Sequence, residues 1–223
     1  MKHLRHIRPY KVFALVDKPP AERIAQFQIP PRRGAGGITM LETALLIAAA
    51  QAVSAKRIFE FGTFLGSTTL NLALNVPDNG RVFTLDLDET SARQLHQHPA
   101  DAPLTTIHLA SHTDFEGSSV APRITQLRGN SVAFDFSSWA GSIDLVFVDG
   151  GHDLTTVEAD TEAAFRLVAG DRPSCVLWHD YGNADYPDLT SYLEQLASTR
   201  RLFHIEDTML CAWFNDPLGL RLL

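Results

Sequence analysis

Acidic and histidine side chains stand at two places in the sequence where their types and spacing suit chemistry. Asp149 and His152 lie three residues apart in DGGHD, and His179 and Asp180 are adjacent in WHDYG. Two carboxylates that are brought together repel each other, and a divalent cation such as Mg²⁺ relieves that repulsion because it prefers oxygen ligands. A cation there would lower the pKa of a bound hydroxyl group, and an imidazole could accept the released proton near neutral pH. We therefore predict Asp149, His179 and Asp180 as metal ligands, and Asp149 and His152 as catalytic residues.

A second feature is the stretch RIFEFGTFLGSTT, residues 57–69. It has the pattern of a short buried strand that ends near Glu60, turns through Gly62 and Gly66, and enters a helix. Glycine permits a positive φ and a close ligand, and a helix N-terminus offers free N–H groups. Asp86 follows 24 residues after Gly62, about the separation at which a βαβ unit brings an acid to a ribose. Together these residues predict a ligand that carries a ribose.

The elements that must position these residues alternate between strand and helix patterns. Apolar runs predict strands at residues 58–61, 81–85, 124–128, 143–148 and 174–178. Amphipathic spacing predicts helices at residues 39–54, 67–75, 88–98 and 155–170, and from Pro187 onward. Residues 202–206 and 209–214 read as two strands joined by a tight connection. The pattern predicts an α/β fold, a Rossmann-like doubly wound and mostly parallel seven-stranded sheet with a C-terminal antiparallel hairpin.

Two stretches show no clear period. Residues 1–37 contain five prolines and three glycines, which predicts an N-terminal arm or lid with a short helix near residues 21–27. The arm precedes a single domain, residues 38–223, and could cap a substrate pocket or mediate a homo-oligomer. Residues 99–119 are predicted to be a loop-rich insertion with one short strand, residues 105–109. The histidines of that region lack the spacing of a zinc site.

Composition excludes several classes of protein. The 45% hydrophobic and 20% charged content is ordinary for a globular protein, and the net charge of −7 argues against a nucleic-acid partner. No apolar run reaches the roughly 18 residues that span a bilayer, and the basic N-terminus has no apolar segment of a secretory signal after it. Cys175 and Cys211 lie in apolar runs, which predicts buried free thiols. We expect a cytoplasmic protein without a membrane partner.

Five motifs occur in a fixed order, namely FEFGTFLGSTT, FTLDLDE, RGNS, DLVFVDGGHD and VLWHDYG. This set resembles the metal-dependent small-molecule O-methyltransferase branch of the class I S-adenosylmethionine (SAM) dependent methyltransferases, over residues 38–214. The resemblance implies a SAM cofactor, a possible divalent cation and a small hydroxylated acceptor. The cofactor-binding residues that it implies are Glu60, Gly62, Thr63, Gly66, Ser67, Asp86, Asn130, Ser131 and Asp149.

The chain departs from the catechol-type members of that branch at the acceptor end. It has His152 where they have a Lys, and the order His179-Asp180-Tyr181 where they have Asp-Asn. These differences are more like the members that act on sugar hydroxyls and antibiotic intermediates. Asn183 could complete the metal shell in place of His179. The acceptor pocket could be lined by Trp139, Trp178 and Tyr181.

Two other functions fit some of the same residues. Asp149, His152 and His179 are the residue types of a two-histidine, one-carboxylate iron site, which some hydroxylase-like relatives would use. The chain could also bind SAM or another nucleotide without catalysis, with Asp149 and Asp180 acting only as caps of the turns that follow them.

Overall fold

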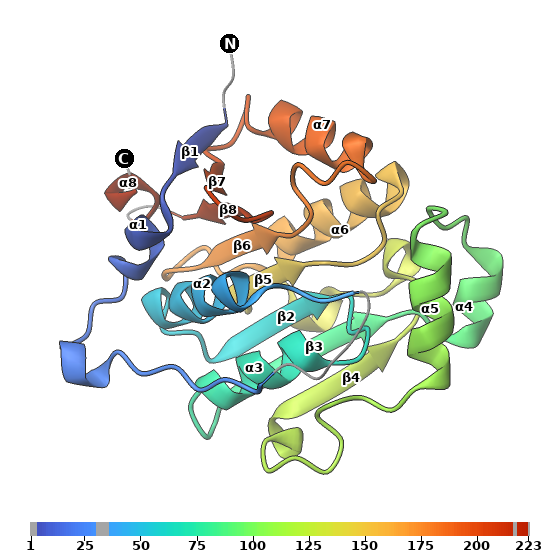
Figure 1. The fold of residues 1–223 in the computed structure, drawn as a ribbon, viewed down its shortest axis with the longest axis horizontal. Helices are drawn as coiled ribbons and strands as arrows, with labels where there is room; N and C mark the ends of the chain where they lie inside the picture. Colours follow the sequence, from blue (N-terminus) through green and yellow to red (C-terminus); the bar gives the residue numbers. More distant parts are fainter. Residues whose placement is uncertain (1–3, 30–35, 216–217, 223) are drawn as a thin grey trace.

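A single sheet organises the chain. The structure is a computed structural model that describes residues 4–29, 36–215 and 218–222. Eight strands in these residues pair in the order β1-β7-β8-β6-β5-β2-β3-β4, and among them β8 alone runs antiparallel to its neighbours (Figure 1). The strands are β1 (Arg5–Ile7), β2 (Arg57–Phe61), β3 (Arg81–Asp86), β4 (Ile124–Arg128), β5 (Leu145–Val148), β6 (Cys175–Trp178), β7 (Phe203–Ile205) and β8 (Cys211–Phe214).

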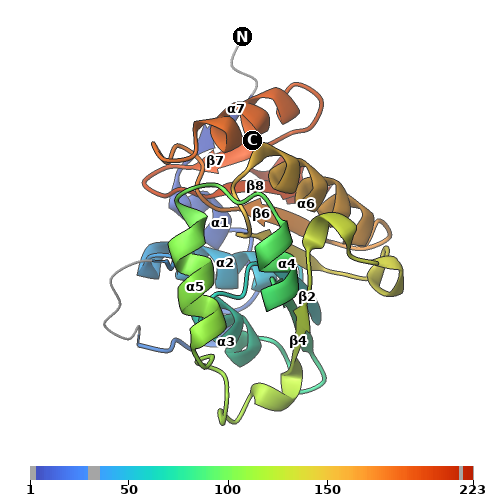
Figure 2. The same ribbon diagram turned by 90° about the vertical axis from the view of Figure 1, so that its right-hand side faces the viewer.

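Helices cover both faces of the sheet. The helices are α1 (Pro9–Phe13), α2 (Met40–Ala52), α3 (Ser67–Asn75), α4 (Glu89–Gln94), α5 (Asp101–Ala110), α6 (Leu154–Leu167), α7 (Pro187–Leu196) and α8 (Leu218–Arg221). Short 3₁₀ turns are η1 (Pro20–Glu22), η2 (Ala121–Arg123), η3 (Ser131–Ala133) and η4 (Ser137–Trp139). Helices α1, α2 and α3 lie on one face and α6 and α7 on the other, while α4 and α5 stand at the carboxyl ends of the central strands (Figures 1 and 2).

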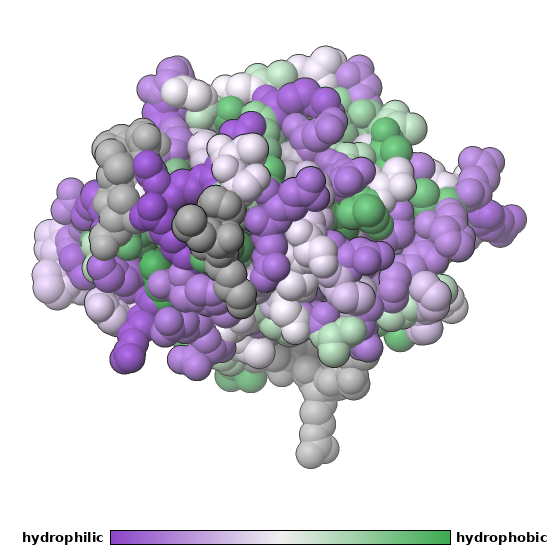
Figure 3. Space-filling model, turned by 90° about the horizontal axis from the view of Figure 1, so that it is seen from above, coloured by the Kyte–Doolittle hydropathy of each residue, from purple (hydrophilic) through white to green (hydrophobic). Residues whose placement is uncertain are grey.

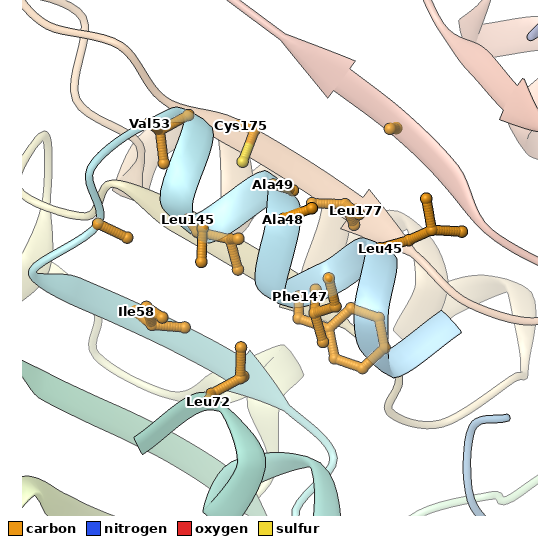
Figure 4. Packing of buried hydrophobic residues seen from close by; sticks show 14 of the residues in the cluster. Leu45, Ala48, Ala49, Val53, Ile58, Leu72, Leu145, Phe147, Cys175 and Leu177 are labelled. Carbon is orange, nitrogen blue, oxygen red and sulfur yellow. The ribbon is translucent and has the colours of Figure 1, made fainter. Parts of the chain in front are cut away.

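The core explains why the central strands have uninterrupted apolar sequences. All four residues of β5 and all four of β6 are buried, because helices cover the sheet on both sides. Figure 4 shows Leu45 and Ala49 of α2 above Leu145 and Phe147 of β5, with Leu177 of β6 beside them. Cys175 and Cys211 are buried and free, as predicted.

The predicted fold class is confirmed. Helix α3 has the predicted bounds, and the hairpin of β7 and β8 is antiparallel. Helix α2 begins with a capping box, in which Thr39 Oγ1 accepts from the Glu42 N–H and the Glu42 carboxylate accepts from the Thr39 N–H. The sheet has one strand more than predicted, because β1 in the arm pairs in parallel with β7.

The insertion at residues 99–119 is helical where a strand was predicted. Residues 105–109 belong to α5, which begins at Asp101. The proline in its first turn is tolerated because the N–H at that position has no intrahelical partner. The Asp101 and His108 side chains are both buried against the carboxyl ends of the strands. Tertiary contacts therefore stabilise this helix, which the local sequence pattern does not predict. Helix α6 also begins differently, with Asp153 as its N-cap and without a Thr155–Glu158 capping box.

The predicted helix at residues 21–27 is wrong. Only η1 forms there, and the chain then runs without helix or strand to residue 29. Two side chains of α3 replace helical hydrogen bonds, because Asn75 Oδ1 accepts from the Gln26 N–H at 2.9 Å and Asn71 Oδ1 accepts from the Gln28 N–H at 2.8 Å. Part of the arm, residues 30–35, lies outside the described residues.

The surface has no feature that dominates the view from above. Figure 3 shows a mostly hydrophilic face on which hydrophobic residues form small separate groups. Among the described residues, every helix is too short or too polar to cross a lipid bilayer.

Candidate active site

One cavity of about 730 Å³ opens at the carboxyl ends of the central strands. Its walls come from the turns after β2, β3, β4, β5 and β6, from α5, and from residues 36–40. Most of the predicted site residues line it, namely Gly62, Thr63, Gly66, Ser67, Asp86, Ser131, Asp149, His152, His179 and Asp180. Two do not: Glu60 lies behind the wall, and Asn130 caps η3 by accepting from the Val132 N–H.

The turn after β2 needs glycine at two positions. Gly62 has φ +90°, and a Cβ there would stand 1.9 Å from the carbonyl oxygen of Asp149. Gly66 has φ +78° directly before α3, and a Cβ there would stand 2.6 Å from the Phe115 ring. The missing side chains therefore allow this turn to pack against the turn after β5 and keep the N-terminus of α3 open to the cavity.

Glu60 supports that turn from inside the protein. Its carboxylate accepts hydrogen bonds from the Thr69 hydroxyl and, at 2.6 Å, from the Thr84 hydroxyl. Burial raises the pKa of Glu60 to about 8, because it outweighs the two hydrogen bonds, which lower that pKa. Thr63, which lines the cavity, contacts Thr84 at 2.7 Å, so Glu60 acts on the wall through hydroxyl groups.

Asp86 is held in a fixed orientation at the end of β3. Its carboxylate accepts from the Phe64 N–H and the Leu87 N–H, each at 2.7 Å. His108 of α5 lies 3.7 Å from it and also contacts the Phe64 carbonyl at 2.6 Å. The side chain of Asp86 remains 19% exposed, so its carboxylate is available to a ligand in the cavity.

Asp149, His179 and Asp180 form the cluster that the sequence predicted. His179 Nδ1 lies 3.3 Å from Asp149 Oδ1 and 3.0 Å from Asp180 Oδ2. One candidate ligand atom from each residue lies within 4.8 Å of the others. Burial disfavours the charged imidazole, but the surrounding carboxylates prevail and raise the pKa of His179 to about 12. Burial raises the pKa of Asp149.

The donors of this cluster fit a divalent cation. They are two carboxylates and one imidazole nitrogen, and His179 Nε2 faces Glu42 Oε1 at 3.4 Å. A carboxylate behind a histidine ligand is the usual support of such a ligand. Asn183 does not join the cluster, because its amide N–H donates to Asp180 Oδ1 at 2.6 Å and its oxygen accepts from the Asp185 N–H.

His152 is clamped by two residues that the sequence did not single out. Asp101 accepts from the backbone N–H of His152 at 2.8 Å and from Nδ1 at 2.9 Å, while Nε2 lies 3.0 Å from Asp180 Oδ2. The Tyr186 ring stacks on the imidazole with centroids 3.7 Å apart, and its hydroxyl donates to Asp101. Burial lowers the pKa of His152, but Asp101 and Asp180 outweigh it and raise that pKa to about 9.

Asp101 and Tyr186 were missed for different reasons. Asp101 lies in the stretch predicted to be a loop, and its acidic side chain in the first turn of α5 was the only local signal. Tyr186 precedes α7, and nothing in its spacing sets it apart. The three aromatic residues proposed from the sequence, Trp139, Trp178 and Tyr181, do not line the cavity. Trp178 is instead fully buried in the core.

Asp160 of α6 was also missed. It lines the cavity although it is only 1% exposed, and its Oδ1 has no hydrogen-bond partner among the described residues. Burial raises the pKa of Asp160 to about 7, because it outweighs a hydrogen bond from the Ser131 side chain, which lowers that pKa. Asp160 lies within a helix and does not follow a strand, so the sequence pattern gave no reason to predict it as a site residue.

Residues 59–181, more than half of the chain, match a family model described as a methyltransferase domain. The chain belongs to this methyltransferase family. The matched residues of the methyltransferase contain the glycine turn, Asp86, Asp160 and the Asp149–Asp180 cluster. No curated protein sequence matches it.

Solved structures that the methyltransferase resembles share its fold. The O-methyltransferase of Bacillus cereus in complex with S-adenosylhomocysteine (SAH) is 17% identical with a TM-score of 0.56, over 80% of this chain and 83% of that one. TomG of Streptomyces achromogenes, an O-methyltransferase of tomaymycin synthesis solved with SAM, is 20% identical with a TM-score of 0.52, over 79% and 80%. SAH-bound PaMTH1 of Podospora anserina is 14% identical with a TM-score of 0.57, over 95% and 89%.

Proposed function

We propose that this methyltransferase takes its methyl group from SAM and transfers it to a hydroxyl oxygen of a small molecule with the help of a divalent cation. The observation that carries the proposal is that the glycine turn with Asp86 and the Asp149–His179–Asp180 cluster line one cavity. A nucleoside-binding wall and a cation-binding wall therefore face the same space, as a cofactor and a metal-held acceptor would require.

The cofactor half would hold SAM at three points. Asp86 presents a carboxylate to the ribose hydroxyls, Gly62 and Gly66 keep the backbone open to the amino-acid end, and Ser131 lies on the wall that would receive the adenine. SAM supplies an activated methyl group when it is bound, so the residues of the chain need only bind, orient and exclude water. Relatives of the same fold that were solved with SAM or SAH support this assignment.

The acceptor half would be organised by Asp149, His179 and Asp180. A divalent cation held by them would lower the pKa of an acceptor hydroxyl. His152 faces this cluster through Nε2, while Asp101 fixes its Nδ1–H. A cation bound to Asp180 would neutralise the carboxylate that favours a second proton on the imidazole, so that Nε2 could accept the proton of that hydroxyl. Glu42 and Asn183 orient the cation-binding residues from behind.

The hydroxylase alternative receives less support from the same geometry. Among the described residues the ligand cluster joins one histidine with two carboxylates. His152 would be the second histidine of an iron site, but it does not belong to this cluster. The remaining alternative is cofactor binding without catalysis, and a methyl-transfer assay distinguishes it from the proposed function.

The arm fits the role of a lid over this domain. Gln28, Gly36 and Gly37 line the cavity, and the Ser67 hydroxyl donates to Gln28 Oε1 at 3.2 Å. We therefore propose a lid role for the second half of the predicted arm, residues 1–37, because β1 and α1 in its first half belong to the sheet and the core. Residues 38–223 would form the catalytic domain. A homo-oligomer through the arm stays a prediction, which light scattering of the full chain tests.

Calorimetry and a methyl-transfer assay test the proposal together. We expect SAH to bind, Mn²⁺ or Mg²⁺ to bind, and labelled methyl from SAM to reach an acceptor in a panel of catechols, polyols and sugars. Asp149→Asn should weaken cation binding and leave SAH binding within a few-fold, whereas Asp86→Asn should do the reverse. Binding of NAD without binding of SAH would refute the proposal, and binding of SAH with no transfer across the panel would favour the non-catalytic alternative.

A further inference from the structure

Asp160 has a buried oxygen that the protein does not satisfy. The residue lies on the cavity wall, is 1% exposed, and leaves Oδ1 without a hydrogen-bond partner among the described residues. Buried polar atoms are nearly always paired, and leaving one unpaired costs its full desolvation penalty. A ligand that carries an N–H or O–H group would supply the missing partner.

The position of Asp160 indicates which part of a ligand it would meet. Asp160 accepts from the Ser131 side chain, which follows β4. That turn adjoins the predicted ribose acceptor, since the Gly129 N–H donates to the Asp86 carbonyl at 2.9 Å. On its other side, a Cβ at Gly150 would stand 3.0 Å from Asp160 Oδ2. Asp160 therefore lies where the turns after β4 and β5 meet, on the side of the cavity next to Asp86.

The groups around this corner suit a flat base with an amino group. Leu87, which follows Asp86, gives the cavity an apolar surface for the face of a ring. Asp160 and Thr156 project from one face of α6, four residues apart, and both line the cavity. A carboxylate accepts hydrogen bonds, so this wall would match a base edge that donates.

We infer that the Asp160 carboxylate accepts a hydrogen bond from the exocyclic amino group of the cofactor's adenine, with Ser131 orienting the carboxylate. The inference rests on the proposed function, because it takes SAM as the ligand. The inference goes beyond the proposed function in one respect: Asp160 would select adenine over other bases. Hypoxanthine carries a carbonyl oxygen where adenine carries the amino group. At pH 8.5 and above, where Asp160 with its pKa of about 7 is ionised and where binding is to be measured, that oxygen would face the carboxylate with no proton between them.

Binding of two matched ligands to the full chain tests the inference without an acceptor. Calorimetry compares SAH with S-inosylhomocysteine, which differs only in that the adenine is replaced by hypoxanthine. We expect the wild-type protein to bind SAH at least about tenfold more tightly. Asp160→Asn should bring the two affinities within about threefold, because an amide side chain can donate as well as accept. Glu158→Gln, an exposed position on the same helix, is the control and should keep the wild-type ratio.

The outcomes separate this inference from the proposed function. Equal binding of the two ligands by the wild-type protein would overturn the role of Asp160 and leave SAM as the cofactor. Failure of both ligands to bind would overturn the cofactor assignment, and the role of Asp160 with it. A wild-type ratio that persists in Asp160→Asn would show that another group selects the base. Should Asp160→Asn fail to fold, Ser131→Ala is the second variant: it removes the hydrogen bond that orients the Asp160 carboxylate and should reduce the preference for SAH, and an unchanged preference would overturn the inference.

Discussion

Replacing Glu60 with glutamine should make the protein markedly more stable at alkaline pH. Glu60 is fully buried, and its pKa is raised from 4.5 to about 8. The folded state therefore holds this proton more tightly than the unfolded state does, so the stabilising contribution is complete below pH 4.5 and is lost as the pH rises toward 8. At about 1.4 kcal/mol per pH unit, the loss is about 1 kcal/mol at pH 5 and about 4 kcal/mol at pH 8.

Glutamine resembles the protonated acid and can accept the same hydroxyl hydrogen bonds, but it does not ionise. Glu60→Gln should exceed the wild-type free energy of unfolding by about 1 kcal/mol at pH 5 and by about 4 kcal/mol at pH 8. Urea unfolding followed by circular dichroism between pH 5 and pH 8 measures both values. The exposed change Glu158→Gln serves as the control. Parallel pH curves for wild type and Glu60→Gln would refute the reasoning, and a large loss of SAH affinity in this variant would show that Glu60 binds the cofactor directly.

Three further predictions concern contacts at the site and at the opposite, amino ends of β2 and β5. Gly62→Ala places a Cβ 1.9 Å from the Asp149 carbonyl at φ +90°, and it should lower the free energy of unfolding by about 2–4 kcal/mol; a urea-derived loss under 0.5 kcal/mol would contradict the close approach. Asp101→Asn removes a negative charge from His152 and should lower the imidazole pKa of the metal-free protein from about 9 by at least about one unit; an unchanged proton NMR titration would contradict the clamp. Asp144→Ala should lower the free energy of unfolding in urea by about 3 kcal/mol, because this buried carboxylate accepts from two backbone N–H groups and an arginine. A loss under about 1 kcal/mol, like that of an exposed ion pair, would contradict a structural role of the buried carboxylate.

The sequence predicted the sheet and the strand-end residues well for a physical reason. Parallel strands buried on both faces need continuous apolar runs, and polar residues directly after such runs must gather at one edge. Asp86, Asp149 and Asp180 could therefore be placed together before the structure was known. The capping box at Thr39 and Glu42 likewise depends on neighbours in the chain, so it can be read locally.

The groups that complete the site come from helices, and their placement depends on contacts far apart in the chain. Asp101 lies 51 residues from His152, and α5 forms where its own sequence favours no clear element. Asp160 is one polar residue within an amphipathic helix, and only the packing of α6 against η3 brings it to the cavity. Glu60 shows the converse case, since it stands at a strand end but its side chain faces inward. The period-2 alternation of a strand decides which face it takes.

The pairing of β1 with β7 has a consequence for how the chain can be shortened. Three residues of the arm cover the hydrogen-bonding edge of β7, where Phe203 and Ile205 are fully buried. A chain that begins after Arg8 would leave that edge open, with unpaired N–H and C=O groups beside apolar side chains. Open edges of this kind recruit strands from other molecules. Self-association of such a truncated protein would report an uncovered sheet edge, and it would give no information on the assembly of the intact protein.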